Sequence, residues 1–444
     1  MNYDVIVIGA GTAGAVASKR ISEKGYNVAL LDLKDKSQIG NKVCGDAIGH
    51  HHFEELKIKP PQKGEDLEML VDGVEIFSPN KQTKFTVGGD YMGYIINRHI
   101  FGQKLLNEAL DAGAQLFDNH KVLTLSRKNL YEIQARNRID NNLISFFAPI
   151  IIDGSGQAGI IRKKVPYFME DPVLPEEVEV CYREIRQLKT GDLDNPSYLK
   201  IYLNSSQVPG GYIWHFPEGN GKINIGLGVQ MKKGHANPKD LFNKYVHPIF
   251  KESKIIHAGG GMVPTRRPIW SLVSDGILLI GDAACTVNPI HGGGIGSGMQ
   301  SAVHAANAIV SYFETENLDE LWKYNVAYSK GYGQKQAQLD IFRLLLQRLD
   351  DQDLNWGMEK KLIKEEDVLK ASLGEGLNLN ITDKIKRFFK GIRKVSLLNR
   401  LRKVAKSMKQ IKELYINYPN SLNELDPWKK EVLKIYEETN KLFD

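Results

Sequence analysis

The N-terminal stretch of this 444-residue chain constrains its fold more than any other. Residues 5–8 form a short β-branched apolar run, typical of a strand buried on both faces. Gly9, Gly11 and Gly14 follow in the spacing G-x-G-x-x-G, at the start of a predicted helix. The next apolar strand ends in Asp32, whose carboxylate can accept hydrogen bonds from a ribose hydroxyl. This pattern predicts a Rossmann-type site in which a helix N-terminus faces the diphosphate of NAD or FAD.

Composition narrows the class of protein further. No apolar run approaches the ~20 residues that a membrane-spanning helix needs. The first apolar run lacks a preceding basic segment, so we do not expect a signal peptide. The three cysteines, Cys44, Cys181 and Cys285, are too few and too scattered for a disulfide framework or a zinc site. We therefore expect a cytoplasmic protein that contacts a membrane at most from its surface.

Three later features point to the same kind of cofactor. Arg98 stands at the start of a predicted helix, Asp153-Gly154 follows a buried strand, and Gly281-Asp282 follows another. In this order, the motifs resemble the FAD superfamily of para-hydroxybenzoate hydroxylase type. The resemblance implies that Arg98 lies near the FAD diphosphate, which a guanidinium fork fits, and that Asp282 accepts a ribitol hydroxyl. The other FAD-binding residues that it implies are Ala13, Cys44, Gly45, Ala47, Val122, Asp153, Gly154, Pro289, Gly292, Gly293, Gly294 and Ile295.

Two further stretches resemble the signatures of geranylgeranyl reductases. They are Lys42-Val-Cys-Gly-Asp-Ala47, and Tyr212-Ile-Trp-His-Phe-Pro217 followed by Asn224-Ile-Gly226. The resemblance is closest to the archaeal enzymes that saturate digeranylgeranyl glycerophospholipids, and it covers essentially the whole chain. It implies FAD, a polyprenyl ether lipid substrate, and NAD(P)H or reduced ferredoxin as electron donor. Glu218 departs from the pattern, because a lysine often stands there.

The expected fold class is α/β, or α+β overall, in three parts. An FAD-binding domain is expected from residues 1–62, 93–163 and 274–316. A substrate domain, built on an antiparallel sheet, is expected from residues 63–92 and 164–273. Beyond residue 317 the pattern predicts helices alone.

The aromatic residues Tyr212, Trp214 and Phe216 alternate along a predicted strand. Side chains at this spacing share one face, so they form a flat apolar wall that can line a slot for a polyene. Ordinary packing between sheets is the alternative interpretation. Asn220-Gly221 predicts the hairpin turn that follows.

Cys44 is the candidate catalytic residue. Reducing an isolated alkene needs hydride at one carbon and a proton at the other, and a donor of moderate acidity nearby assists the second step. The resemblance places Cys44 against the flavin ring, where it either donates that proton or positions the alkene. The alternative is a small buried apolar side chain, as lone cysteines usually are.

Three other features leave two interpretations open. His50, His51 and His52 are either a metal site or a helix surface, and adjacent histidines cannot all face one ion. The loop with Arg266 and Arg267 either faces a phosphate or is solvated. A basic run extends from Lys384 to Lys412 without an acid, and its apolar members recur at helical spacing. They are Leu401, Val404, Met408, Ile411 and Tyr415.

The basic run is either a helix packed on the body or a surface for anionic lipid. Nucleic acid is not expected as a partner, because aromatic residues are not interleaved with the charges. Two other functions compete with the reductase. One is an aromatic monooxygenase or halogenase on the same flavin scaffold, and the other is a non-catalytic carrier of polyprenyl lipid.

Overall fold

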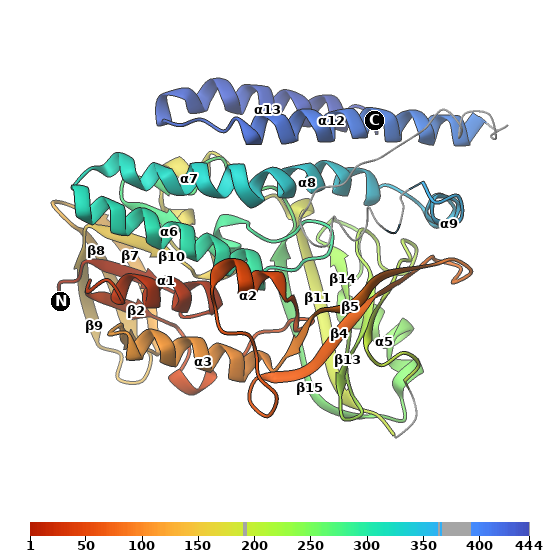
Figure 1. The fold of residues 1–444 in the computed structure, drawn as a ribbon, viewed down its shortest axis with the longest axis horizontal. Helices are drawn as coiled ribbons and strands as arrows, with labels where there is room; N and C mark the ends of the chain where they lie inside the picture. The colour runs from red at the N-terminus through yellow and green to blue at the C-terminus, as the bar shows by residue number, and fades with distance from the viewer. Residues whose placement is uncertain (190–192, 363–364, 366–391, 444) are drawn as a thin grey trace.

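The computed structural model describes residues 1–189, 193–362, 365 and 392–443. These residues form three β-sheets beneath a layer of helices (Figure 1). In this part of the chain, no helix combines the length and apolar character that crossing a membrane requires.

A six-stranded sheet carries the nucleotide-binding motifs. Its order is β16-β17-β10-β1-β2-β6, with β1 parallel to both β2 and β10. The strands are β16 (Val273–Ser274), β17 (Ile277–Leu279), β10 (Ile150–Asp153), β1 (Val5–Ile8), β2 (Val28–Leu31) and β6 (Gln115–Phe117). The strands β1, β2, β10 and β17 are buried throughout, as their unbroken apolar runs predict. The helices α1 (Thr12–Ser22), α3 (Arg98–Asp111) and α6 (Ile295–Thr315) pack together, with α1 in contact with both others.

An eight-stranded sheet lies beside the first. Its order is β15-β11-β14-β13-β12-β4-β5-β3, antiparallel except for the β12–β4 pair. The strands are β15 (Lys254–Pro264), β11 (Val178–Gln187), β14 (Lys222–Gln230), β13 (Ile213–Gly219), β12 (Tyr198–Tyr202), β4 (Leu67–Phe77), β5 (Lys84–Ile96) and β3 (Ala47–Gly49). Asn220 and Gly221, with φ of 50° and 71°, form the predicted hairpin turn. The largely antiparallel sheet was thus predicted correctly, while β3 and the end of β5 extend it beyond the expected segments.

A third, three-stranded sheet consists of β7 (His120–Arg127), β8 (Tyr131–Asn137) and β9 (Leu143–Ala148). Its apolar face joins the core of the six-stranded sheet through Ile133 and Phe146, which are both fully buried. Shorter helices complete this part of the chain: α2 (His51–Leu56), α4 (Pro166–Met169) and α5 (Pro238–Tyr245).

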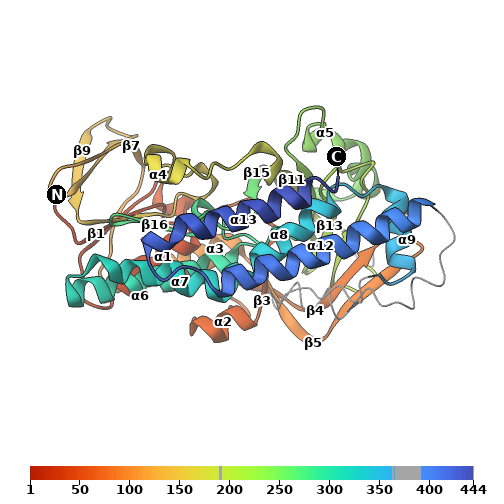
Figure 2. The same cartoon turned by 90° about the horizontal axis from the view of Figure 1, so that it is seen from above.

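Helices cover the sheets in the C-terminal part, as predicted for the described residues beyond 317. They are α7 (Trp322–Tyr328), α8 (Gln334–Leu346), α9 (Asp351–Glu359), α12 (Ile392–Ile416) and α13 (Leu425–Asn440). Viewed from above, α12 and α13 run along α7 and α8, and α12 contacts α8 directly (Figure 2).

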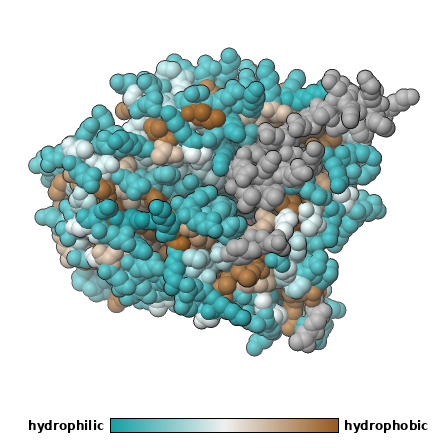
Figure 3. All heavy atoms as spheres, in the orientation of Figure 1, coloured by the Kyte–Doolittle hydropathy of each residue, from teal (hydrophilic) through white to brown (hydrophobic). Residues whose placement is uncertain are grey.

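The apolar side of α12 faces the body of the protein. Leu401, Val404, Met408, Ile411 and Tyr415 are at most 5% exposed, and they share a core with α8 and α13. The described part of the basic run is therefore a packed helix, with Arg400, Lys403, Lys406 and Lys409 exposed on its outer side. Side chains over α12 and α13 are mainly hydrophilic (Figure 3). The run from Lys384 to Lys390 lies outside the described residues, and so do the side chains of Arg393 and Lys394.

Candidate functional site

One cavity of about 1170 Å³ connects the nucleotide-binding motifs to the helical layer. The carboxyl ends of β1, β2 and β10 open into it through Gly9, Asp32 and Gly154. Every residue that the sequence assigned to cofactor or substrate lines this cavity, except Gly14 and Asp153. Parallel strands place their carboxyl ends at one edge of the sheet, which is where an open α/β fold binds ligands.

The three glycines have different surroundings. A Cβ on Gly9, at φ +97°, would lie 2.4 Å from the carbonyl oxygen of Gly154. A Cβ on Gly14 would lie 1.8 Å from the carbonyl oxygen of Gly9. Because Gly9 and Gly14 have no Cβ, α1 can pack closely against the turn after β1. Nothing lies within 4 Å of a Cβ on Gly11, which lines the cavity. Gly11 is therefore the point at which a diphosphate can approach the backbone.

Asp32 is held firmly at the cavity wall. Its Oδ2 accepts a hydrogen bond from the Ala10 amide at 2.7 Å, and its Oδ1 accepts one from the Lys34 amide at 2.8 Å. Each carboxylate oxygen can accept a further hydrogen bond. This geometry suits a ribose hydroxyl.

Arg98 provides the main test of whether a dinucleotide fits. It begins α3, where the Asn97 side chain caps the helix by accepting from the Ile100 amide at 3.1 Å. The Arg98 side chain donates to Thr12 Oγ1, but its Nε and Nη1 are buried and have no hydrogen-bond partner among the residues that the structure describes. A buried guanidinium with unused donors, facing a cavity beside the first turn of α1, fits a diphosphate.

Asp282 lies on the opposite wall, in a 3₁₀ turn of residues Gly281–Ala284. It is 8% exposed, and its Oδ2 accepts from Lys42 Nζ at 2.7 Å. Sequence reasoning missed this role of Lys42, and no local pattern signals it. The ion pair fixes the Lys42–Ala47 loop next to the N-terminus of α6, where Gly294 lies against Asp282.

Asp153 was predicted to bind the cofactor, but the structure places it behind the cavity lining. It is fully buried, and it does not line the cavity. Its Oδ1 accepts from the amide and hydroxyl of Ser155, and its Oδ2 accepts from the amides of Ile161 and Arg162 at 2.8 and 2.9 Å. With both oxygens used inside the protein, this carboxylate orders the turn after β10.

Cys44 and the aromatic wall meet in the middle of the cavity. Cys44 Sγ accepts a hydrogen bond from the Asp46 amide at 3.3 Å, and burial raises the pKa of the thiol. A Cβ on Gly45 would lie 2.9 Å from the Phe216 ring, so the loop packs directly on the wall. Tyr212 donates to the His291 carbonyl at 2.7 Å and Trp214 donates to Asn224 Oδ1 at 3.0 Å, which satisfies their polar tips.

Aliphatic side chains line the part of the cavity farthest from the glycine motif. They come from the eight-stranded sheet and from the helices above it, which close the space as a roof. The sheet contributes Val71, Val74, Ile76, Val87, Leu199 and Ile201, and the helices contribute Leu345, Leu346, Leu354, Met358, Leu397 and Leu401. Sequence reasoning missed the roof, because apolar residues at helical spacing look like ordinary core.

The histidines lie at the start of a helix, as the helix-surface interpretation predicted, but with half-buried side chains. His51 and His52 begin α2, are half-buried and line the cavity. The His52 ring occupies the space beside Gly296 on α6, and burial lowers its pKa to about 3. Within the described ranges, no group of three His, Cys, Asp or Glu side chains could hold a metal ion.

The arginine loop is neither phosphate-facing nor solvated, which corrects both interpretations. Arg266 and Arg267 are 1% and 6% exposed, and both pair with Asp171 at 2.6 and 2.7 Å. The Arg267 guanidinium also lies 3.4 Å from the centre of the Trp270 ring.

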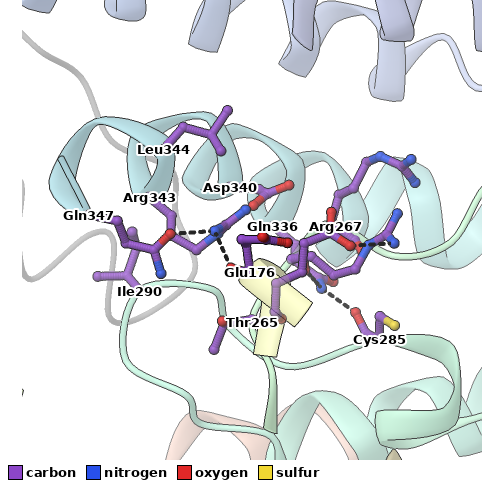
Figure 4. Close-up of polar contacts among 12 residues, drawn as sticks. Glu176, Thr265, Arg267, Cys285, Ile290, Gln336, Asp340, Arg343, Leu344 and Gln347 are labelled. Atoms are coloured by element: carbon purple, nitrogen blue, oxygen red, sulfur yellow. Dashed lines mark hydrogen bonds and ion pairs between the residues drawn. The ribbon is translucent and has the colours of Figure 1, made fainter. Parts of the chain in front are cut away.

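Helix α8 holds this loop and the cavity wall together. Gln336 donates to the carbonyl oxygens of Arg266, Cys285 and Val287. About two turns further on, Arg343 pairs with Asp340 at 2.8 Å and donates to Gln347 at 2.6 Å (Figure 4). The run from Pro289 to Gly294, which lines the cavity, is thereby anchored to the helical layer.

Comparison with known proteins identifies the family. The chain is 40% identical to a digeranylgeranylglycerophospholipid reductase of Sulfolobus acidocaldarius, over 99% of both chains. It belongs to the digeranylgeranylglycerophospholipid reductase family. A family member from Methanothrix thermoacetophila is 30% identical over 84% of this chain and 94% of its own. The family description "Geranylgeranyl reductase catalytic domain" matches residues 177–263, and "Glucose inhibited division protein A" matches residues 4–59.

Solved structures show the same fold. A geranylgeranyl bacteriochlorophyll reductase-like protein of Thermoplasma acidophilum has a TM-score of 0.74 at 23% identity, covering 91% of this chain and 99% of its own. A flavin-dependent brominase has a TM-score of 0.64 at 16% identity, covering 87% and 97%. The brominase shares the scaffold alone, and family membership favours the reductase over the halogenase alternative.

Proposed function

We propose that the protein is an FAD-dependent reductase that saturates the C=C bonds of geranylgeranyl chains in archaeal-type ether phospholipids. One observation carries the proposal. A single cavity is lined by the buried Arg98 guanidinium, by the Cys44 thiol and by a group of aliphatic side chains. Its volume of about 1170 Å³ exceeds the roughly 300–1,000 Å³ of small-molecule pockets, as expected where a cofactor and a lipid chain share one space.

The residues that would hold FAD are those of the dinucleotide end. Arg98 and the Gly11 backbone would receive the diphosphate, Asp32 a ribose hydroxyl, and Asp282 a ribitol hydroxyl. The glycines from Gly292 to Gly294 allow backbone amides to approach a flat ring. When bound and reduced, FAD supplies the hydride.

The protein's own side chains would do the rest. The aliphatic residues of the sheet and of the helical roof would enclose the polyene and exclude water. The wall of Tyr212, Trp214 and Phe216 would orient the reacting bond. Because burial raises the pKa of Cys44, its thiol stays protonated near neutral pH. Sγ can give its proton to the less substituted carbon of the double bond, so that positive charge develops at the tertiary carbon, which would receive the hydride.

We also propose a peripheral position on the cytoplasmic side of a membrane. The exposed residues Arg400, Lys403, Lys406 and Lys409 on α12 would attract anionic lipid. Because the apolar side of α12 is buried, this contact would be electrostatic and sensitive to salt.

We further propose that NAD(P)H or reduced ferredoxin supplies the electrons. Of the three expected domains, the first would bind FAD, the second would hold the lipid, and the helical third would cover the channel.

An anaerobic experiment tests the function. The enzyme's flavin is photoreduced, digeranylgeranylglycerophospholipid is added without oxygen, and flavin absorbance is followed. A reductase reoxidises its flavin under these conditions. In a monooxygenase or halogenase, the flavin would stay reduced until oxygen is added. In a lipid carrier, it would stay reduced throughout. Absence of reoxidation therefore rejects the proposal.

A further inference from the structure

Asp46 lies two residues after Cys44, and its backbone amide contacts the thiol. Its φ of 60° is left-handed, which is uncommon for a residue other than glycine. The Asp46 amide donates to Cys44 Sγ at 3.3 Å, and the Cys44 side chain is close enough to act on the pKa of the Asp46 carboxyl. Asp46 is 3% exposed, and it lines the cavity.

Asn224 links the Asp46 carboxyl group to the backbone of Cys44. Its amide donates to Asp46 Oδ2 and to the Cys44 carbonyl oxygen, both at 2.9 Å, while it accepts from Trp214. The other carboxyl oxygen, Oδ1, accepts no hydrogen bond from the residues that the structure describes. An unsatisfied buried carboxylate is unfavourable, whereas the protonated group has an O–H to donate.

Charged groups approach Asp46 from three other elements. Arg183 on β11 places Nη2 at 3.9 Å from Oδ2, Glu218 lies on β13, and Arg98 lies on α3. Burial raises the pKa of Asp46 to about 7, Arg183 and Arg98 oppose this, and Glu218 adds to it. Both forms of the carboxyl are therefore populated near neutral pH. Glu218, itself 4% exposed, is the residue that departs from the family pattern.

Each reduced bond consumes the Cys44 proton, if the proposed function holds. The thiolate must then regain a proton within a cavity that lipid fills. We propose that the Asp46 carboxylic acid is the proton reservoir that restores the Cys44 thiol between turnovers. In this step the O–H bond of Asp46 breaks, the S–H bond of Cys44 forms, and no electrons move.

A line of polar groups leads from this reservoir to solvent. Arg183 Nη1 lies 3.0 Å from Nδ1 of His257, which is exposed on β15. A guanidinium can only donate, so Nδ1 accepts and Nε2 carries the proton of the neutral ring. Because a guanidinium does not release its proton, Arg183 holds the carboxylate without relaying a proton to it, and Asp46 regains its proton from water when the saturated lipid leaves the cavity.

Asp46→Asn tests the inference, because it keeps the shape and removes the titratable group. In a single turnover with photoreduced enzyme and digeranylgeranylglycerophospholipid, the thiol is already loaded, so the first bond is reduced at the wild-type rate. With excess dithionite, the steady-state rate falls at least about tenfold after a burst of one bond per active site. Glu132→Gln on β8, away from the cavity, serves as the control variant that changes neither rate.

Two outcomes would overturn the inference. One is an unchanged steady-state rate in Asp46→Asn, and the other is an equal loss in single and multiple turnovers, which would mark a positioning role. If the flavin of the wild-type enzyme itself fails to reoxidise, the proposed function fails instead.

Glu218→Lys is a second, independent test. A positive charge at this position lowers the pKa of Asp46, so the alkaline limb of the pH profile of the steady-state rate moves to lower pH. A limb that stays in place would also overturn the inference.

Discussion

Lys42 Nζ and Asp282 Oδ2 lie 2.7 Å apart in the lining of the cavity, although 240 positions separate them in the chain. The contact joins the loop that carries Cys44 to the turn before α6. A nucleotide-binding turn and a candidate proton donor are thereby held at one place in the cavity. Cofactor binding and placement of the thiol should be coupled through this pair.

Cys44→Ala is expected to bind FAD but to reduce alkenes slowly. A general acid contributes about 10²- to 10⁴-fold, so flavin reoxidation by the lipid should slow by at least about a hundredfold. Stopped-flow absorbance in a single turnover measures this rate. Cys44→Ser keeps a weaker proton donor, so its rate of flavin reoxidation should lie between those of the wild type and Cys44→Ala. Wild-type kinetics in both variants would remove Cys44 from the mechanism.

Arg98→Met should have opposite effects on FAD binding and on the stability of the apoprotein. Loss of hydrogen bonds to a charged diphosphate costs about 1.5–3 kcal/mol, so FAD affinity should fall roughly ten- to hundredfold. Without FAD, the variant removes buried donors that have no partner, so the apoprotein should unfold at the same or a higher urea concentration. Fluorescence titration and urea denaturation check the two effects. If FAD affinity were unchanged, the diphosphate would not bind at Arg98.

Asp171→Asn should destabilise the whole fold, because it leaves Arg266 and Arg267 buried without their counter-ion. Breaking such a pair costs about 3–5 kcal/mol. The two arginines hold the pKa of Asp171 down at about 2, against an opposing effect of burial. A carboxyl group with a lowered pKa stabilises the folded state at pH values above its ordinary pKa of about 3.9. For Asp171 this contribution of about 2 kcal/mol is lost as the pH falls toward about 2. Urea denaturation near neutral pH and near pH ~3 measures both quantities.

The comparison of Asp171→Asn with the wild type over the same pH range serves as a control for the pH effect. Asp171→Asn should lose most of the acid sensitivity that this one group gives to wild-type protein. An equal stability of the two proteins near neutral pH would contradict the assigned role. Glu170→Gln, at the exposed neighbour of Asp171, should leave stability unchanged.

Leu397→Trp should shorten the channel. Leu397 on α12 lines the cavity, whereas its buried neighbour Leu398 does not. Overpacking costs each site about 1–3 kcal/mol, so Leu397→Trp and Leu398→Trp should be destabilised alike. Mass spectrometry of the lipid should show partly reduced products for Leu397→Trp alone. The same products from both variants would mean that α12 does not limit the channel.

Local patterns predicted where the dinucleotide end of the cavity lies. Gly9 and Asp32, which line the cavity, depend on neighbours within a short stretch of chain and on strands whose burial is visible in their composition. The expectation for Arg98 came from the family resemblance, and Arg98 also lines the cavity. The alternation of Tyr212, Trp214 and Phe216 likewise predicted a shared face on the cavity.

Roles set by distant partners were not predictable. Asp153 and Asp282 both follow buried strands, yet one carboxylate is used up by backbone amides and the other faces the cavity. Arg266 and Arg267 looked solvated or phosphate-facing until Asp171 supplied their counter-ion. The helical roof depends on packing of α12 against α8, which composition does not reveal.

The number of bonds reduced for each flavin oxidised tests the central claim most directly. Photoreduced enzyme is mixed with excess digeranylgeranylglycerophospholipid in the absence of oxygen, and the lipid is analysed by mass spectrometry after a single turnover. We expect one double bond to be reduced, with a gain of two hydrogen atoms, for each flavin that returns to the oxidised state. Flavin oxidation without a gain in lipid mass, or lipid bound to flavin that stays reduced, would contradict the account.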